Sequence, residues 1–166
     1  SFGFNEISIS GGSPTATTLG TTPTVDVYQL NATTELLSTF FTMPLDWDKE
    51  TDVTFDLLCS LRATEVSGDD LDLTYDYVAI QDKVTAKGLA KTSTSVTTST
   101  ELTTAQGLAS GDVYKVSVNL SRRDANNGWG FGDTTTGIGI EWHLTNTTTV
   151  ADITIIGGQL NYTAVY

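Results

Sequence analysis

Few side chains in this 166-residue chain could perform acid–base or nucleophilic chemistry. The chain has one histidine, His143, and one cysteine, Cys59, and neither lies in a nucleophile motif. His143 alternates with apolar neighbours and is interpreted as a solvated strand histidine. Asp72 and Asp76 share one face of an alternating segment, where a solvated sheet surface explains a carboxylate pair without any chemistry. The residues therefore predict a protein that is not an enzyme, holds no cofactor and acts on no small-molecule substrate.

An acidic segment offers a weak candidate site for a metal ion. Carboxylates occupy every second position in it, at Asp46, Asp48, Glu50 and Asp52. Oxygen ligands at alternate positions are typical of calcium loops, but the glycine that an EF-hand loop needs at its sharp turn is missing. An acidic solvated turn and a divalent-cation site both stay open. Zinc is not expected, because one histidine and one cysteine are too few ligands.

A glycine-rich loop carries two aromatic side chains that could contact another molecule. Trp129 and Phe131 alternate there with glycines. Such rings can stack on a sugar, or they can pack against the end of the fold or against another subunit. Trp129 and Phe131 are therefore candidates for exposed-loop contact, and packing and ligand stacking both stay open.

Strict two-residue alternation shows which elements must position these side chains. The runs at 53–61, 116–120 and 138–144 have apolar residues at every second position. Because successive side chains of a strand point to opposite faces, each run buries one face and exposes the other. The pattern predicts a core that contains Val53, Phe55, Leu57, Cys59, Leu61, Val116, Val118, Leu120, Ile138, Ile140 and Trp142. The Cys59 thiol is accordingly expected to be buried and inert.

Eight strand candidates with several long connections predict an all-β fold. We expect a single eight-stranded jelly-roll β-sandwich or barrel, viral capsid-like, with Greek-key connections. Strands at 52–62 and 71–82 flank a Ser-Gly-Asp-Asp turn signal and are expected to form a hairpin. The last strand is expected to be bulged at Gly157 and Gly158. The chain is divided into an N-terminal strand with a polar arm (1–23) and a single β-barrel domain (24–166).

The N-terminal segment is expected to mediate self-association. Phe2, Phe4, Ile7 and Ile9 could form a strand, which a polar tether at 11–23 joins to the rest of the chain. A strand on such a tether can pair with its own sheet or with the sheet of a neighbour. These four residues are the candidates for the interface of a homodimer or larger oligomer. The alternative is an arm that folds back onto its own barrel.

Composition excludes some partners. The formal net charge is −12 with only eight basic side chains, too few to neutralise a phosphate backbone, so direct nucleic-acid binding is not expected. The same charge argues against adsorption to an anionic membrane surface. No apolar stretch approaches the roughly 18 residues that span a bilayer, and no signal segment is expected after Ser1.

The segment from residue 43 to residue 166 resembles small β-barrel proteins of tailless phage particles. The resemblance rests on Met-Pro-Leu-Asp-Trp-Asp at 43–48, Ser-Gly-Asp-Val-Tyr-Lys-Val at 110–116 and Leu-Ser-Arg-Arg-Asp at 120–124. Most similar is the family of single-jelly-roll major capsid proteins from icosahedral, internal-membrane-containing viruses of thermophiles and halophiles. Their shells are usually built from two protein types, and this chain looks like the smaller one.

The resemblance implies a structural virion protein, located in the capsid shell. Such a single-β-barrel subunit self-associates and packs with a second capsid protein into an icosahedral shell, close to an internal membrane. No catalytic residues are implied. A carbohydrate- or receptor-binding β-sandwich module is the alternative, and a particle-surface or secreted hydrolase is the third and least supported hypothesis.

Overall fold

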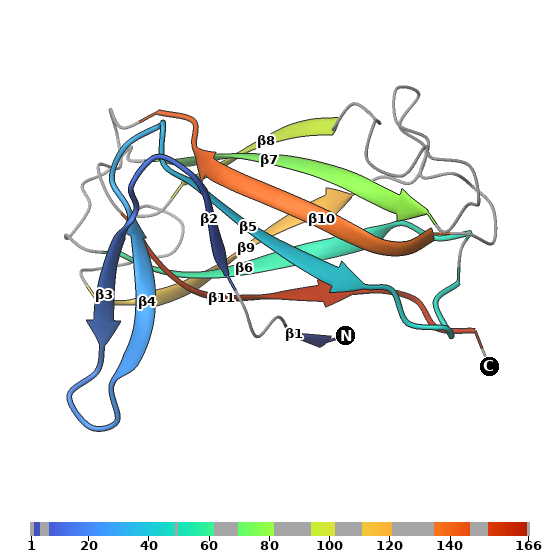
Figure 1. Ribbon diagram of the computed structural model, residues 1–166, viewed down its shortest axis with the longest axis horizontal. Coiled ribbons are helices and arrows are strands. Elements are labelled where there is room, and N and C mark those ends of the chain that lie inside the picture. Colours follow the sequence, from blue (N-terminus) through green and yellow to red (C-terminus); the bar gives the residue numbers. More distant parts are fainter. Residues whose placement is uncertain are drawn as a thin grey trace.

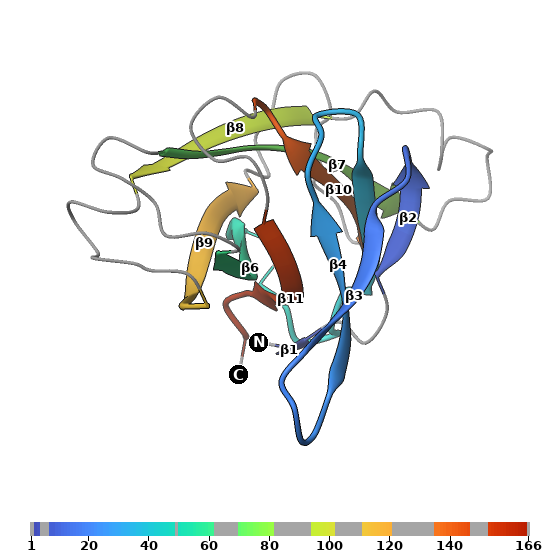
Figure 2. The same cartoon turned by 90° about the vertical axis from the view of Figure 1, so that its left-hand side faces the viewer.

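The part of the chain that the structure describes is built from β-strands. This computed structural model describes residues 2–3, 7–48, 50–61, 70–81, 94–101, 111–120, 135–146 and 153–165. Within these ranges eleven strands form two antiparallel sheets that lie face to face (Figure 1, Figure 2). The expected all-β, two-sheet architecture is confirmed. The described residues include no helix of the length and apolar character that crossing a membrane requires.

The two sheets are named A and B. Sheet A has the order β3-β4-β11-β6-β9, with β1 beside β11, and sheet B has the order β2-β5-β10-β7-β8. The strands of sheet A are β1 (Phe2–Gly3), β3 (Thr15–Leu19), β4 (Val25–Leu30), β6 (Val53–Leu61), β9 (Val113–Leu120) and β11 (Ile153–Asn161). The strands of sheet B are β2 (Ser8–Gly11), β5 (Leu36–Thr42), β7 (Asp70–Gln81), β8 (Thr94–Glu101) and β10 (Thr135–Leu144).

Eight of these strands pair in a nested order. β7 pairs with β8, β6 with β9, β5 with β10 and β4 with β11, and every pair is antiparallel. β10 also pairs with β7, and β11 also pairs with β6. The two strands nearest the C-terminus therefore lie inside the sheets, each between two earlier strands.

The expected hairpin between the strands at 52–62 and 71–82 is wrong. β6 belongs to sheet A and β7 to sheet B, so the connection between them passes from one sheet to the other. Alternation identifies the apolar face of each strand but not the strand beside it. Here the two apolar faces meet across the sandwich, where the rings of Phe55 and Tyr75 pack edge to face with centroids 6.0 Å apart.

The core between the sheets follows the alternation. All eleven residues predicted to be buried are exposed by no more than 3%. Phe55 lies at the centre of an aromatic group, with ring centroids 5.7 Å from Trp142 and 5.9 Å from Phe41. These contacts join sheet A to sheet B, so burial of apolar surface is the main force holding the layers together.

The N-terminal strands extend both sheets. β2 pairs with β5, β3 with β4, and the two-residue β1 with β11 beside Gln159 and Leu160. The polar segment at 11–23 was expected to be an arm or loop, but β3 forms within it. Threonine-rich sequence suits an edge strand, where β-branched side chains face water. The turn between β3 and β4 extends beyond the two sheets (Figure 1, Figure 2).

Candidate functional site

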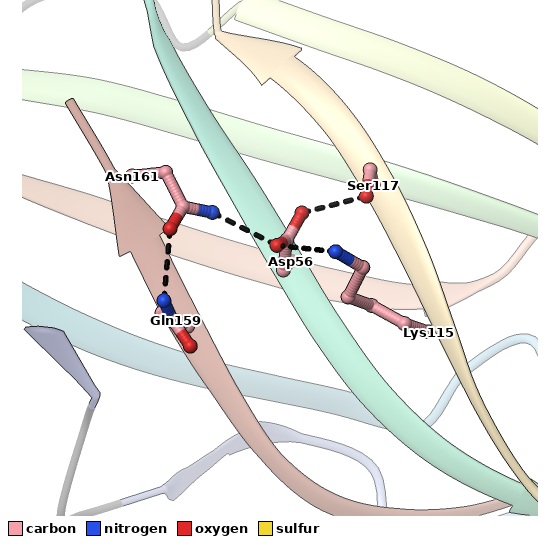
Figure 3. A network of polar contacts seen from close by, with 5 residues as sticks. All are labelled: Asp56, Lys115, Ser117, Gln159 and Asn161. Atoms are coloured by element: carbon pink, nitrogen blue, oxygen red, sulfur yellow. Dashed lines mark hydrogen bonds and ion pairs between the residues drawn. The ribbon is translucent and has the colours of Figure 1, made fainter. Parts of the chain in front are cut away.

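The outer face of sheet A carries a carboxylate at its centre. Phe55 and Leu57 point into the core, so Asp56 between them points outward. β6 lies between β9 and β11, and Asp56 is in register with Ser117 on one side and Gln159 on the other. Three sequence segments that are far apart along the chain thus meet at this one residue (Figure 3).

Asp56 accepts hydrogen bonds from both neighbouring strands. Ser117 Oγ donates to Asp56 Oδ1 at 2.6 Å. Lys115 Nζ donates to Asp56 Oδ2 at 3.0 Å, and Asn161 Nδ2 donates to the same oxygen at 2.8 Å. Gln159 Nε2 donates to Asn161 Oδ1 at 2.9 Å and extends the network along β11 (Figure 3). These five residues are called the Asp56 cluster.

The electrostatics of the Asp56 cluster keep the carboxylate ionised. Burial raises the pKa of Asp56, but the hydrogen bonds from Ser117, Lys115 and Asn161 and the charge of Lys115 outweigh it, so the pKa lies below its usual value of 3.8. The Asp56 side chain is 12% exposed and that of Lys115 is 59% exposed. A low pKa and three bound donors make Asp56 a poor proton acceptor, so the cluster is a structural clamp rather than a general base.

A shallow hollow of about 290 Å³ lies beside the Asp56 cluster. It is lined by Asp56, Leu58, Lys115, Ile156, Gly157, Gly158 and Gln159. The register of β11 with β6 shifts between Ile155 and Gly157, next to the expected bulge. The two glycines that follow have no side chains to fill the surface. The hollow is therefore a small apolar depression with the Lys115 ammonium at its edge.

The outer face of sheet B carries an exposed aromatic residue. Phe40 on β5 is 53% exposed and lies in register with Gly139 on β10. A Cβ atom at Gly137 would lie 2.3 Å from Phe40 Cζ, so the ring leans over this glycine. Glu141, the next outward residue of β10, is in register with Asp76 of β7. The structure thus brings an aromatic ring and two carboxylates to one face.

His143 lies on the same face, and no nucleophile or carboxylate of the described residues is hydrogen-bonded to it. It is in register with Thr74, half-buried rather than fully solvated, and its Nδ1 is shielded without a hydrogen-bond partner. The Thr74 hydroxyl is engaged instead with Thr145 Oγ1 at 2.7 Å and Thr97 Oγ1 at 3.2 Å. Asn146 Nδ2 donates to Asp72, which ties the chain after β10 across this end of the face.

The four acidic side chains that were candidates for a cation site make separate contacts. Asp48 Oδ1 accepts the Glu50 N–H at 2.9 Å, and Asp52 Oδ2 accepts a bond from Asn119 Nδ2 at 3.3 Å. Asp46 and Glu50 are exposed. Within the described ranges no three His, Cys, Asp or Glu side chains are grouped so that they could hold a metal ion.

The interface candidates are placed in part. Phe2 lies in β1, in register with Leu160, whereas Phe4 falls outside the described residues. Ile7 packs partly buried against the core, and Ile9 on β2 is 48% exposed. Trp129 and Phe131 also fall outside the described residues.

An exposed apolar pair was missed from the sequence. Leu45 is fully exposed and Val165 is 56% exposed. Their segments are joined by hydrogen bonds from Val165 N to Asp46 O and from Asp48 N to Thr163 O, each 2.7 Å. Leu45 and Val165 are called the apolar end. In the sequence, the apolar end is indicated by a lone leucine, Leu45, in the acidic turn after Pro44.

Comparison with known proteins identifies no family. No protein-family model and no curated protein matches the sequence. Among solved structures, the enzymatically active domain of tailspike protein 4 from bacteriophage CBA120 gives a TM-score of 0.45 at 11% identity over 95% of this chain and 19% of that chain. This chain therefore spans about a fifth of the tailspike chain's length.

Two carbohydrate-binding modules show similar scores. The CBM22-1 xylan-binding domain of Paenibacillus barcinonensis Xyn10C gives a TM-score of 0.42 at 11% identity, over 99% of this chain and 86% of that one. The family 11 module of Clostridium thermocellum was solved with a β-1,3-1,4-mixed-linked tetrasaccharide. It gives a TM-score of 0.42 at 10% identity, over 98% of this chain and 92% of that one. Similarity of this degree establishes neither ancestry nor a ligand.

Proposed function

We propose that this chain is a structural subunit of a virus particle, a single-β-barrel coat protein that associates with copies of itself and with a second coat protein. The observation that carries the proposal is the nested pairing of β4 with β11, β5 with β10, β6 with β9 and β7 with β8. Eight strands paired in this order support a jelly roll, the double-sheet architecture of viral capsid and lectin domains.

The chemistry of the described residues supports a role without catalysis. The Asp56 cluster has a carboxylate whose pKa is lowered and whose oxygens already accept three donors. His143 has neither a nucleophile nor an orienting carboxylate bonded to it among the described residues. A subunit whose task is to pack needs rigid surfaces rather than reactive groups.

The apolar end supports contact with another subunit. Leu45 and Val165 are held on segments joined by short backbone hydrogen bonds, so their apolar side chains are presented on ordered backbone. Burying such side chains against a partner removes apolar surface from water at little cost in backbone entropy. The acidic residues around Leu45 limit contact at low salt, because copies of the same acidic chain repel one another.

Light scattering of the purified chain over a range of ionic strength tests this proposal. We expect the mass to rise with salt to a defined oligomer, because salt screens the repulsion between acidic copies. Leu45→Asp should weaken association by about tenfold or more, whereas Val25→Asp, at a half-exposed position away from the apolar end, should not. A chain that stays monomeric at every salt and protein concentration would contradict the proposal.

A second candidate function is carbohydrate or receptor binding. The specific observation in its favour is Phe40, which exposes about half of its surface on an ordered sheet rather than on a loop. Aromatic rings on rigid elements are common anchors for ligands, since little side-chain entropy is lost on binding.

A further inference from the structure

We propose that the outer face of sheet B binds a neutral glycan, with Phe40 as the stacking platform and the carboxylates of Glu141 and Asp76 as acceptors for its hydroxyl groups. The inference rests on the second candidate function and adds to it a site, a ligand class and a selectivity for uncharged sugars. Phe40, Gly137, Gly139, Glu141 and Asp76 are called the Phe40 face.

The platform is formed by one aromatic residue and two glycines. Phe40 Cζ and Cε2 lie 2.3 and 2.6 Å from where a Cβ of Gly137 would be, so only a glycine admits the ring here. Gly139 lies directly across from Phe40, and it too has no side chain to hide the ring. Covering the backbone of a strand glycine is one reason for an aromatic residue at this place. It does not explain the acidic residues that follow.

The carboxylates of Glu141 and Asp76, called the acidic row, follow the Phe40 platform along the sheet. Glu141 is two residues along β10 from Gly139, or about 7 Å. It is in register with Asp76, and neither carboxylate is hydrogen-bonded or ion-paired to another described residue. Like charges directly opposite on neighbouring strands destabilise a sheet. Carboxylates only accept hydrogen bonds, so a ligand that donates hydroxyl protons offsets this cost.

The surroundings favour a sugar over other ligands. Ser38 is in register with Glu141, and the exposed Thr42 is in register with Gly137, so hydroxyl groups flank the platform. Hydroxyls both donate and accept, as those of a sugar do. The acidic row repels carboxylated, sulfated or phosphorylated ligands. A flat ring beside glycines suits the apolar face of a pyranose, whereas a peptide side chain prefers a pocket.

Titration calorimetry of the purified chain tests the inference with linear hexasaccharides of glucose, mannose and galactose, and with an oligogalacturonide of the same length. We expect at least one neutral chain to bind and the oligogalacturonide not to bind. Phe40→Ala should weaken binding by about tenfold or more, and Phe40→Tyr should retain it within about threefold.

Val113→Ala is the matched control, because Val113 is also 53% exposed but lies on sheet A. Its binding should be unchanged. Equal binding of the oligogalacturonide, or binding of an oligolysine peptide in place of the sugars, would overturn the inference. Glycan binding that survives Phe40→Ala would overturn the site but leave carbohydrate binding standing. Binding of none of the sugars would overturn both the proposed site and carbohydrate binding in general, and it would leave the coat-protein proposal unaffected.

Discussion

Asp56 joins three strands of sheet A through side chains as well as through the backbone. Its oxygens accept one bond from Ser117, one from Lys115 and one from Asn161. Most side chains on a solvated sheet face contribute little to stability, because exposed ion pairs are weak. Asp56 differs because its carboxylate is largely removed from solvent while each donor is held by a neighbouring strand.

Asp56→Asn should destabilise the fold in a pH-dependent manner. The folded-state pKa of Asp56 is lowered, so its ionised form stabilises the fold above the unfolded-state pKa and this contribution is lost as the pH falls through the folded pKa. We expect a free energy of unfolding lower by about 1–3 kcal/mol near neutral pH, since the amide cannot accept all three donors. Below about pH 3 the difference from wild type should shrink.

Urea unfolding at the two pH values measures this difference. Asp26→Asn makes the same change of charge at an exposed position of β4 and should stay within about 0.5 kcal/mol of wild type. An Asp56→Asn protein as stable as wild type at neutral pH would show that the Asp56 cluster is not a clamp.

Cys59 should report unfolding. Its side chain is fully buried, and burial raises the pKa of the thiol far above the usual range, so almost no thiolate forms in the folded state. A thiol reagent should therefore label Cys59 only through unfolding of the chain, at a rate that rises with urea. Rapid labelling in native buffer would mean that the core around Leu57 opens locally.

At the scale of elements, one glutamate stabilises the turn between β4 and β5. Glu35 is only 7% exposed, and its Oε2 accepts the backbone N–H groups of Asn31 at 2.6 Å and Ala32 at 3.2 Å. Glu35 N also donates to Ala32 O at 3.1 Å. The side chain thus satisfies the backbone of a tight turn at the point where the chain leaves sheet A for sheet B.

Glu35→Ala should lower the free energy of unfolding by about 1–3 kcal/mol, because two backbone donors lose their acceptor. Thr34→Ala is the control: Thr34 is exposed in the same turn and makes none of these bonds. Thermal unfolding of both variants gives the comparison. Equal losses in the two variants would indicate that the turn itself, not the carboxylate of Glu35, limits stability.

The strands and the core could be predicted from the sequence, but the partners of the strands could not. Alternation reports which side of a strand is apolar, and for β6 and β9 it predicted the buried residues correctly. Alternation gives no information on strand register or partners. It therefore could not show that Asp56 lies opposite Ser117, or that β6 and β7 lie in different sheets. β3 was missed because its threonines have no apolar face to bury.

The sequence does indicate that one aromatic ring of β5 is exposed. Phe40 and Phe41 are consecutive in a strand, and consecutive side chains point to opposite faces, so one ring had to face outward. Which one does so is decided by packing: Phe41 contacts Phe55 in the core and is 1% exposed. The carboxylates of Glu141 and Asp76 could not be placed beside Phe40 without the register of β10.

For the whole molecule, the N-terminal strands are the candidates for a link between copies. In the single chain β1, β2 and β3 each pair with a strand of the same sandwich. The eight nested strands β4–β11 contain the entire aromatic group around Phe55. Residues 1–23 lie outside this aromatic group, so we expect a chain without them to keep its core.

Deleting residues 1–23 should leave a folded chain that associates more weakly. We expect an unchanged β-type circular dichroism spectrum, a modest loss of stability, and a lower mass by light scattering at salt concentrations where the full chain is oligomeric. The mass falls because the strands available for exchange with a neighbour are removed. A truncated protein that keeps the full oligomeric mass would assign the contact to the barrel, with the apolar end as the first place to search.

The nested pairing also sets an order of events during folding. The innermost pair, β7 with β8, closes the shortest loop, and each outer pair requires the closure of a longer one, which costs more chain entropy and slows folding. β5 and β7 stay apart in sheet B until β10 enters between them, and β4 and β6 stay apart in sheet A until β11 does. During synthesis the N-terminal half therefore emerges with open strand edges, and the chain cannot complete sheet B until residue 144, or sheet A until residue 161, has left the ribosome.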